Sequence, residues 1–256
     1  MFNNVGPALG EAAISLLFWI IRYLFSYVQR LLWRITGISK RLDYISKNEI
    51  YDVSAHALKI IARFKPPGIN PTFQHFITAH EEFLCPIYIL RDNVSLMCFN
   101  QSGAVFVETS PIVDVYSSRT NPFSYNAQYE HAKRLIVLPF FAFHKLAAEV
   151  GDPVKKIVWM SGTGRCGSTL VSQIFENSEP NVITQVVNLC WYGEITLETH
   201  DKLLQSSVRL MCKSRSPTVD ILFIKTDVVC AALIERISLM FPRIIQLFLY
   251  LSLIHI

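Results

Sequence analysis

The stretch KKIVWMSGTGRCGSTLVSQIFE, residues 155–176, decides the fold class of this chain of 256 residues. Residues 156–160 are a short apolar run typical of buried parallel strands, and residues 168–175 suit the first turns of a helix. The glycine-rich loop between them would direct several backbone N–H groups at one anion, and the helix dipole would add to the attraction. The stretch therefore predicts an α/β fold: a P-loop-type parallel sheet flanked by helices, with an anion site at the loop.

The loop departs from the nucleotide P-loop pattern G-x-x-x-x-G-K-[ST] at one position. Gly162, Gly167 and Thr169 fit the pattern, whereas Ser168 stands in place of the lysine that contacts the β- and γ-phosphates. Arg165 can supply positive charge instead, because a guanidinium holds an anion through two parallel hydrogen bonds. A P-loop kinase or NTPase is therefore one hypothesis, and the missing lysine argues against it.

The segment SGTGRCGSTL, residues 161–170, resembles the 5′-phosphosulfate loop of the sulfotransferase family, with Arg165 at the place of the family's lysine. The resemblance implies that 3′-phosphoadenosine 5′-phosphosulfate (PAPS) is the co-substrate and that its sulfuryl group passes to an acceptor hydroxyl or amine. Arg165 would be catalytic by stabilising charge during transfer, and Glu179, in a Ser-Glu-Pro stretch, is the candidate general base. The implied cofactor-binding residues are Gly162, Thr163, Gly164, Arg165, Cys166, Gly167, Ser168 and Thr169.

The segments after the loop are similar in order to the sulfotransferase core. VDILFIKTD (219–227) and RIIQLFLY (243–250) predict strands, and VVCAALIERISLMFP (228–242) predicts a helix between them. Lys225, near the end of its strand, either adds charge to the site or is an ordinary exposed lysine. The arginine and serine that the family places after the last strand are missing, since LSLIHI (251–256) follows. We therefore expect a truncated or degenerate member with an incomplete sheet, and a non-enzymatic membrane-associated protein is the third hypothesis.

The most hydrophobic stretch is LGEAAISLLFWIIRYLFSYVQRLLWRI, residues 9–35. On a helix its polar residues share one narrow stripe, formed by Glu11, Ser15, Arg22, Ser26 and Gln29. This pattern predicts a helix in the membrane interface, with its aromatic residues on the apolar face and its arginines on the other. A single-pass transmembrane helix with a snorkelling or paired Arg22 is the alternative, and a buried helix is the third.

The compartment stays open between two alternatives. Basic residues follow the hydrophobic stretch, which favours a cytoplasmic position for the rest of the chain. The N-glycosylation patterns at Asn93-Val-Ser95 and Asn100-Gln-Ser102 require instead the Golgi or secretory lumen.

Composition and spacing argue against two classes of site. The net charge is only +4, without a lysine- and arginine-rich block, so no nucleic-acid partner is expected. The six cysteines lack zinc-ligand spacing, so no metal site is expected, while a Cys85–Cys98 disulfide stays open. The histidines at 56, 75 and 80 have no partner at ligand spacing and are interpreted as ordinary residues.

The middle of the chain carries no recognisable chemistry. Residues 46–64 predict a helix, residues 82–110 a three-stranded antiparallel meander, and residues 125–151 a helix kinked or broken at Pro139. The chain thus divides into three regions: a membrane-associated helix and linker (1–45), a helix and β-meander region (46–150), and a partial sulfotransferase-like domain (151–256).

Overall fold

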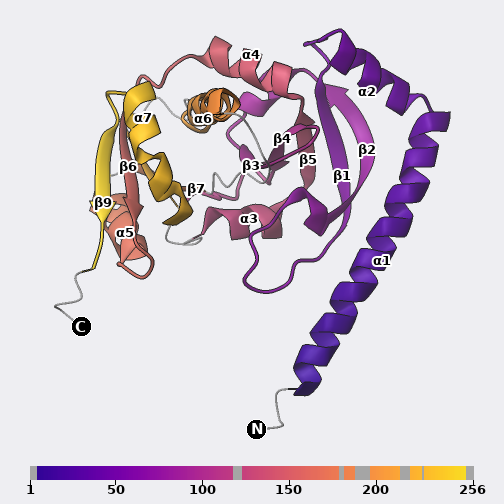
Figure 1. The fold of residues 1–256 in the computed structure, drawn as a ribbon, viewed down its shortest axis with the longest axis horizontal. Coiled ribbons are helices and arrows are strands. Elements are labelled where there is room, and N and C mark those ends of the chain that lie inside the picture. The colour runs from indigo at the N-terminus through magenta and orange to yellow at the C-terminus, as the bar shows by residue number, and fades with distance from the viewer. Residues whose placement is uncertain are drawn as a thin grey trace.

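The computed structural model describes residues 5–117, 123–178, 182–187, 197–213, 220–226 and 228–251. In this part of the chain, an antiparallel and a parallel sheet form the body (Figure 1). A long apolar helix, α1 (Val5–Ile35), runs along the outside of the antiparallel sheet, and the shorter α2 (Ile38–Lys47) follows it. The predicted mixed α/β class, with an apolar N-terminal helix and an antiparallel sheet before a parallel one, is confirmed.

The antiparallel sheet has the strand order β2-β1-β5-β4-β3. The hairpin predicted from residues 94–110 is confirmed, but two other predictions were wrong. The predicted helix 46–64 contains a strand instead, because a short stretch rich in apolar residues fits either structure by periodicity alone. The strand predicted at 82–90 begins earlier, and Pro86 starts a short 3-10 helix, since proline cannot donate to a sheet ladder. The bounds are β1 (Ala55–Arg63), β2 (Phe76–Leu84), η2 (Pro86–Leu90), β3 (Val94–Asn100), β4 (Gly103–Glu108) and β5 (Arg134–Leu138).

The helix predicted over residues 125–151 is divided into three elements. They are α3 (Ser124–His131), the strand β5 and α4 (Phe140–Val150). Pro139 precedes the first turn of α4, where its missing N–H costs no hydrogen bond. β5 lies in the middle of the sheet and buries every residue after Arg134, which is why its sequence shows no alternation of polar and apolar residues.

The parallel sheet has the order β7-β8-β6-β9, and the strands predicted at 156–160, 219–227 and 243–250 are confirmed. One further strand, β7, was missed. On one face, Val171 and Phe175 of α5 pack against Met160 and Phe223. On the other face lie α6, η3 and α7. The bounds are β6 (Lys156–Gly162), α5 (Ser168–Ser178), β7 (Val182–Val187), α6 (Leu197–Met211), β8 (Ile221–Thr226), η3 (Val228–Leu233), α7 (Ile234–Met240) and β9 (Ile245–Leu249).

Helix α6 joins the two sheets. Its Leu203 and Leu210 belong to the core of the antiparallel sheet, whereas its Leu204 and Val208 pack against the parallel sheet. The two sheets therefore share one helix as a common wall, and the position of the parallel sheet is fixed by packing.

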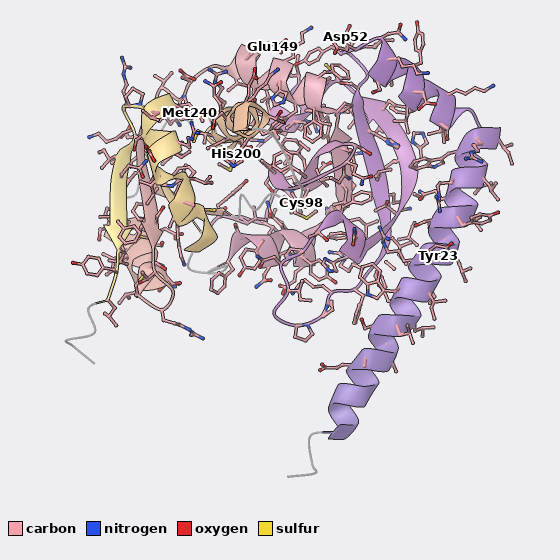
Figure 2. All side chains as sticks on the ribbon, in the orientation of Figure 1. Tyr23, Asp52, Cys98, Glu149, His200 and Met240 are labelled. Atoms are coloured by element: carbon pink, nitrogen blue, oxygen red, sulfur yellow. The ribbon has the colours of Figure 1, made fainter. Side chains whose placement is uncertain are left out.

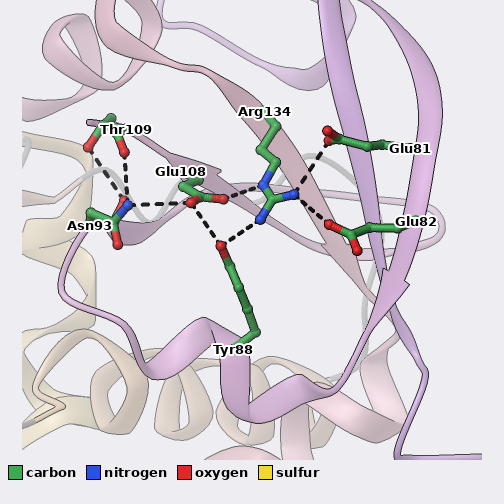
Figure 3. Close-up of polar contacts among 7 residues, drawn as sticks. All are labelled: Glu81, Glu82, Tyr88, Asn93, Glu108, Thr109 and Arg134. Carbon is green, nitrogen blue, oxygen red and sulfur yellow. Dashed lines mark hydrogen bonds and ion pairs between the residues drawn. The ribbon is translucent and has the colours of Figure 1, made fainter. Parts of the chain in front are cut away.

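A polar network holds β2, β4 and β5 together at one end of the antiparallel sheet (Figure 3). Arg134 on β5 donates to Glu108 on β4 and to Glu82 on β2, the latter at 2.8 Å. Tyr88 Oη donates to Glu108 Oε1 at 2.9 Å, and Asn93 Nδ2 donates to the carbonyl oxygen of Thr109 at 2.9 Å. The network is structural: it satisfies partly buried groups where the strands meet.

The fold distinguishes the two glycosylation patterns. The side-chain nitrogen of Asn93, the atom that a glycan would modify, already donates within this network, and Ser95 is buried. Asn100 lies instead at the β3–β4 turn, where its Oδ1 accepts from the backbone nitrogens of Ser102 and Gly103. In a lumenal expression system we expect Asn100→Gln to remove the glycan-dependent mobility shift and Asn93→Gln to leave it; the opposite result would contradict this assignment.

The structure shows how the cysteines at 85 and 98 and the histidines at 56 and 80 are placed. Cys85 and Cys98 are both free thiols, so the disulfide that the sequence left open is absent from the structure. His56 on β1 and His80 on β2 share a hydrogen bond of 2.8 Å between Nε2 and Nδ1. The sequence interpretation of these histidines as ordinary residues did not include this contact, because strand pairing brings them together although they are 24 residues apart.

The buried His56 should make the protein sensitive to acid. Burial, with a smaller effect of His80, lowers the pKa of His56 from 6.5 to about 3. Between these values the unfolded chain binds a proton that the folded chain does not, so stability falls as pH drops below 6.5. We expect a loss of about 2 kcal/mol from this group between pH 7 and pH 5.

Thermal unfolding of the full chain in detergent at both pH values measures this effect. His56→Phe should flatten the dependence of Tm on pH, whatever its effect on stability at pH 7. The exposed His131, changed to Phe, is the matched control. Equal slopes for His56→Phe and the parent would contradict the assignment.

Candidate anion-binding site

The glycine-rich loop lies at the carboxyl edge of the parallel sheet, where β6, β8 and β9 end side by side. Ligands of open α/β sheets bind at this edge. A cavity of about 660 Å³ opens there. It is lined by Phe123, Tyr125, Met160, Ser161, Gly162, Thr163, Gly164, Arg165, Gly167, Ser168, Thr169, Lys225 and Thr226.

The start of the loop is fastened to β9. Thr163 N donates to the carbonyl oxygen of Leu249 at 3.0 Å. A Cβ atom at Gly162 would lie 2.4 Å from that same oxygen and 3.2 Å from Cys166 Sγ, so the position accepts only glycine without movement of the backbone. Cys166 is buried beneath the loop, which gives its side chain a packing role.

The loop then turns through left-handed backbone conformations. Arg165 has a φ of 63° and Gly167 a φ of 84°. Such a φ is costly for a residue with a side chain, and strained residues of this kind are found at ligand sites. The arginine is exposed at the cavity rim, and Ser168 and Thr169 form the first turn of α5.

Lys225 is the cation within the cavity wall. Its side chain is buried, and its Nζ donates to Thr169 Oγ1 at 2.7 Å. The Nζ also lies 5.2 Å from the ring centroid of Phe123, a cation–π distance. The alternative of an ordinary exposed lysine was therefore wrong. The parallel pairing of β6 with β8 brings this residue to the loop.

Phe123 and Tyr125 form an aromatic wall that the sequence did not predict. Their ring centroids lie 5.6 Å apart, and both residues line the cavity from the start of α3. A second contact from the same side is the hydrogen bond from Ser117 Oγ to Glu176 Oε1 of α5, at 2.7 Å. Nothing in the local sequence marks these aromatic residues, since only the packing of α3 beside the parallel sheet places them here.

The charges of the cavity suit an anion. Its described lining carries Arg165 and Lys225 and no acidic residue. The described residues also contain no cluster of three or more histidine, cysteine or acidic side chains that could hold a metal ion. Glu179, the candidate base, lies outside the described residues.

Comparison with known proteins gives no match: no family model, no curated protein and no solved structure is similar to the chain. The fold and the cavity define the class of protein on their own. It is a mixed α/β protein with a cavity, lined by Arg165 and Lys225, at the carboxyl edge of a parallel sheet. The eight residues predicted to bind the cofactor run from the end of β6 to the first turn of α5, and seven of them line the cavity; Cys166 packs beneath it.

Proposed function

We propose that the cavity binds the 5′-phosphosulfate group of PAPS and that the protein is a sulfotransferase-like enzyme. The observation that carries this proposal is the contact between Lys225 and Thr169. In a P-loop NTPase the hydroxyl at the position of Thr169 coordinates Mg²⁺. Here the ammonium group of Lys225 holds that hydroxyl at 2.7 Å, and its charge opposes a divalent cation at the same place.

The charge balance favours a phosphosulfate over a nucleoside triphosphate. A phosphosulfate carries fewer negative charges than a triphosphate, and two protein cations can neutralise it without a metal ion. Arg165 at the rim and Lys225 in the wall supply these cations, and the loop amides before α5 supply hydrogen-bond donors. The aromatic wall offers a stacking surface for the adenine ring or for the acceptor.

The proposed reaction is an in-line displacement at sulfur. The oxygen or nitrogen of the acceptor attacks the sulfur atom, while the bond between sulfur and the 5′-phosphate oxygen breaks. Arg165 and Lys225 stabilise the charge that develops on the sulfuryl and leaving phosphate oxygens. The acceptor's proton passes to a general base, for which Glu179 remains the proposed residue, and phosphoadenosine phosphate is released.

Calorimetric titration of the full chain in detergent with phosphoadenosine phosphate, the desulfated product, tests this function. We expect binding that is unchanged by EDTA. Arg165→Ala and Lys225→Met should each weaken it about 30-fold or more, because each removes a charge-assisted contact. Lys156→Met, at the opposite end of β6, is the matched control.

Two results would contradict the proposal. Binding of ATP that requires magnesium, without binding of the product nucleotide, would assign the cavity to an NTPase. A folded chain that binds neither nucleotide would remove both nucleotide hypotheses and favour a degenerate membrane-associated protein.

We also propose that the protein is membrane-associated. Among the described residues, the segment Gly10–Ile35 of α1 is long and apolar enough to cross a membrane, and little of it is buried against the body. Helices of this composition that stay exposed are found at membranes.

A further inference from the structure

Helix α1 packs its polar stripe and several aromatic residues on the body and exposes a broad apolar half. The polar stripe predicted to face away from the membrane is turned toward the body: Arg22, Ser26 and Gln29 are half-buried, and Gln29 Nε2 donates to the carbonyl oxygen of Thr78 at 2.6 Å. The opposite half of the helix is apolar and exposed. We call this half the outer face; it consists of Ile14, Leu16, Leu17, Ile20, Ile21, Tyr23, Leu24, Tyr27, Val28, Leu31, Leu32 and Ile35. A soluble protein buries such a face.

Contacts with the body run along the C-terminal half of α1, from Phe18 to Trp33. The ring of Phe18 lies 5.4 Å from that of Phe64, and the ring of Trp33 lies 5.3 Å from that of His56. Between residues 18 and 33 the helix advances about 22 Å. Residues 5–17, which project beyond the sheet in Figure 1, reach only about 20 Å, less than the ~30 Å of a bilayer core. A docked α1 therefore cannot span the membrane.

Residues at one border of the outer face suit the lipid headgroups. Arg30 and Arg34 are exposed there, next to Tyr23 and Tyr27 on the helical wheel; Figure 2 labels Tyr23. Arginines extend their charged ends to headgroups, and tyrosines favour the same depth. α1 carries three arginines and only Glu11 as an acid, so its charge complements anionic lipids.

We propose that α1, still docked on β1 and β2, lies in the plane of one leaflet with its outer face in the acyl-chain boundary. The protein is then monotopic, and its N-terminus and body lie on the same side of the membrane. This inference rests on the proposed membrane association and specifies its form. The positive-inside rule, which orients helices that cross, then does not assign the compartment.

The first experiment is flotation of the full chain, diluted from detergent, with vesicles of equal parts phosphatidylcholine and phosphatidylserine. We expect the parent to float and Leu24→Glu to lose about tenfold or more in vesicle affinity, because it removes a buried apolar side chain from the lipid. Leu239→Glu, at a leucine on α7 that is also exposed, should float like the parent. The proposal would be overturned if the parent did not bind vesicles and Leu24→Glu converted it from a dimer to a monomer. The outer face would then pack against a second copy of the chain.

The second experiment separates an in-plane helix from a spanning one. A protease added outside intact vesicles should remove an N-terminal epitope tag from all bound protein. Protection of the tag until the vesicles are permeabilised would overturn the proposal. Binding of phosphoadenosine phosphate is measured on Leu24→Glu in parallel: a normal value shows an intact body, so failure of the membrane proposal is distinguished from failure of the sulfonucleotide proposal.

Discussion

Gly162→Ala should abolish measurable binding of phosphoadenosine phosphate and destabilise the parallel sheet. The new Cβ atom would lie 2.4 Å from the carbonyl oxygen of Leu249, a backbone atom that cannot rotate away as a side chain can. The same oxygen accepts the 3.0 Å hydrogen bond from Thr163 N that fastens the loop to β9. To relieve the clash, loop and strand must separate. We expect a cost of about 1–3 kcal/mol in unfolding free energy, and an affinity loss of about 100-fold or more as the loop amides move away from the anion.

Calorimetry and thermal unfolding of the full chain in detergent measure both effects. Gly10→Ala is the matched control, because nothing lies within 4 Å of the added atom. Adding Cys166→Ala to Gly162→Ala removes the 3.2 Å contact with sulfur but not the contact with the carbonyl oxygen, so the double variant should stay defective. Normal binding by Gly162→Ala, or full rescue by Cys166→Ala, would show that the loop is not held by β9.

The sequence predicted the strand, loop and helix around residues 155–176 because their signals are local. Glycine spacing, a short apolar run and a helix start are all visible within this one continuous stretch. Lys225 and the aromatic wall were different. Lys225 meets Thr169 across 56 residues, and Phe123 reaches the cavity from another region of the chain, so only the folded sheet order brings them together.

The errors in the antiparallel sheet have one physical cause. β5 and the first half of β1, residues 55–58, are covered on both faces, so neither segment shows the alternation of a half-exposed strand. A continuous apolar run fits a buried helix as well as a buried strand, and neighbouring helical segments extended the error through residues 46–64 and 125–151. The helix α1 shows the complementary case. Its aromatic residues were expected on the apolar face, but Phe18 and Trp33 pack on the body beside the polar stripe, because which face meets the body depends on partners far along the chain.

Lys213 shows a further long-range feature that sequence patterns do not reveal. The residue follows the C-terminus of α6, and its side chain is buried. Its Nζ donates to the carbonyl oxygens of Ile89, Arg91 and Val94 at 2.5, 2.6 and 2.7 Å. These carbonyls run from η2 to the first residue of β3, so the ammonium group joins the antiparallel sheet to the end of the helix that the two sheets share.

Lys213→Met should therefore lower the free energy of unfolding by about 3–5 kcal/mol, because it leaves three inward-facing carbonyl oxygens without this donor. Methionine keeps an unbranched side chain of similar length, so little of the loss can come from packing. For a chain of this size, thermal unfolding in detergent should show Tm lower by roughly 10 °C. Lys202→Met, on the exposed side of α6, makes the same chemical change and should stay within about 0.5 kcal/mol of the parent. If the two variants unfold at the same temperature, the carbonyls bind water equally well, and the contact between Lys213 and the η2–β3 segment does not hold the sheets together.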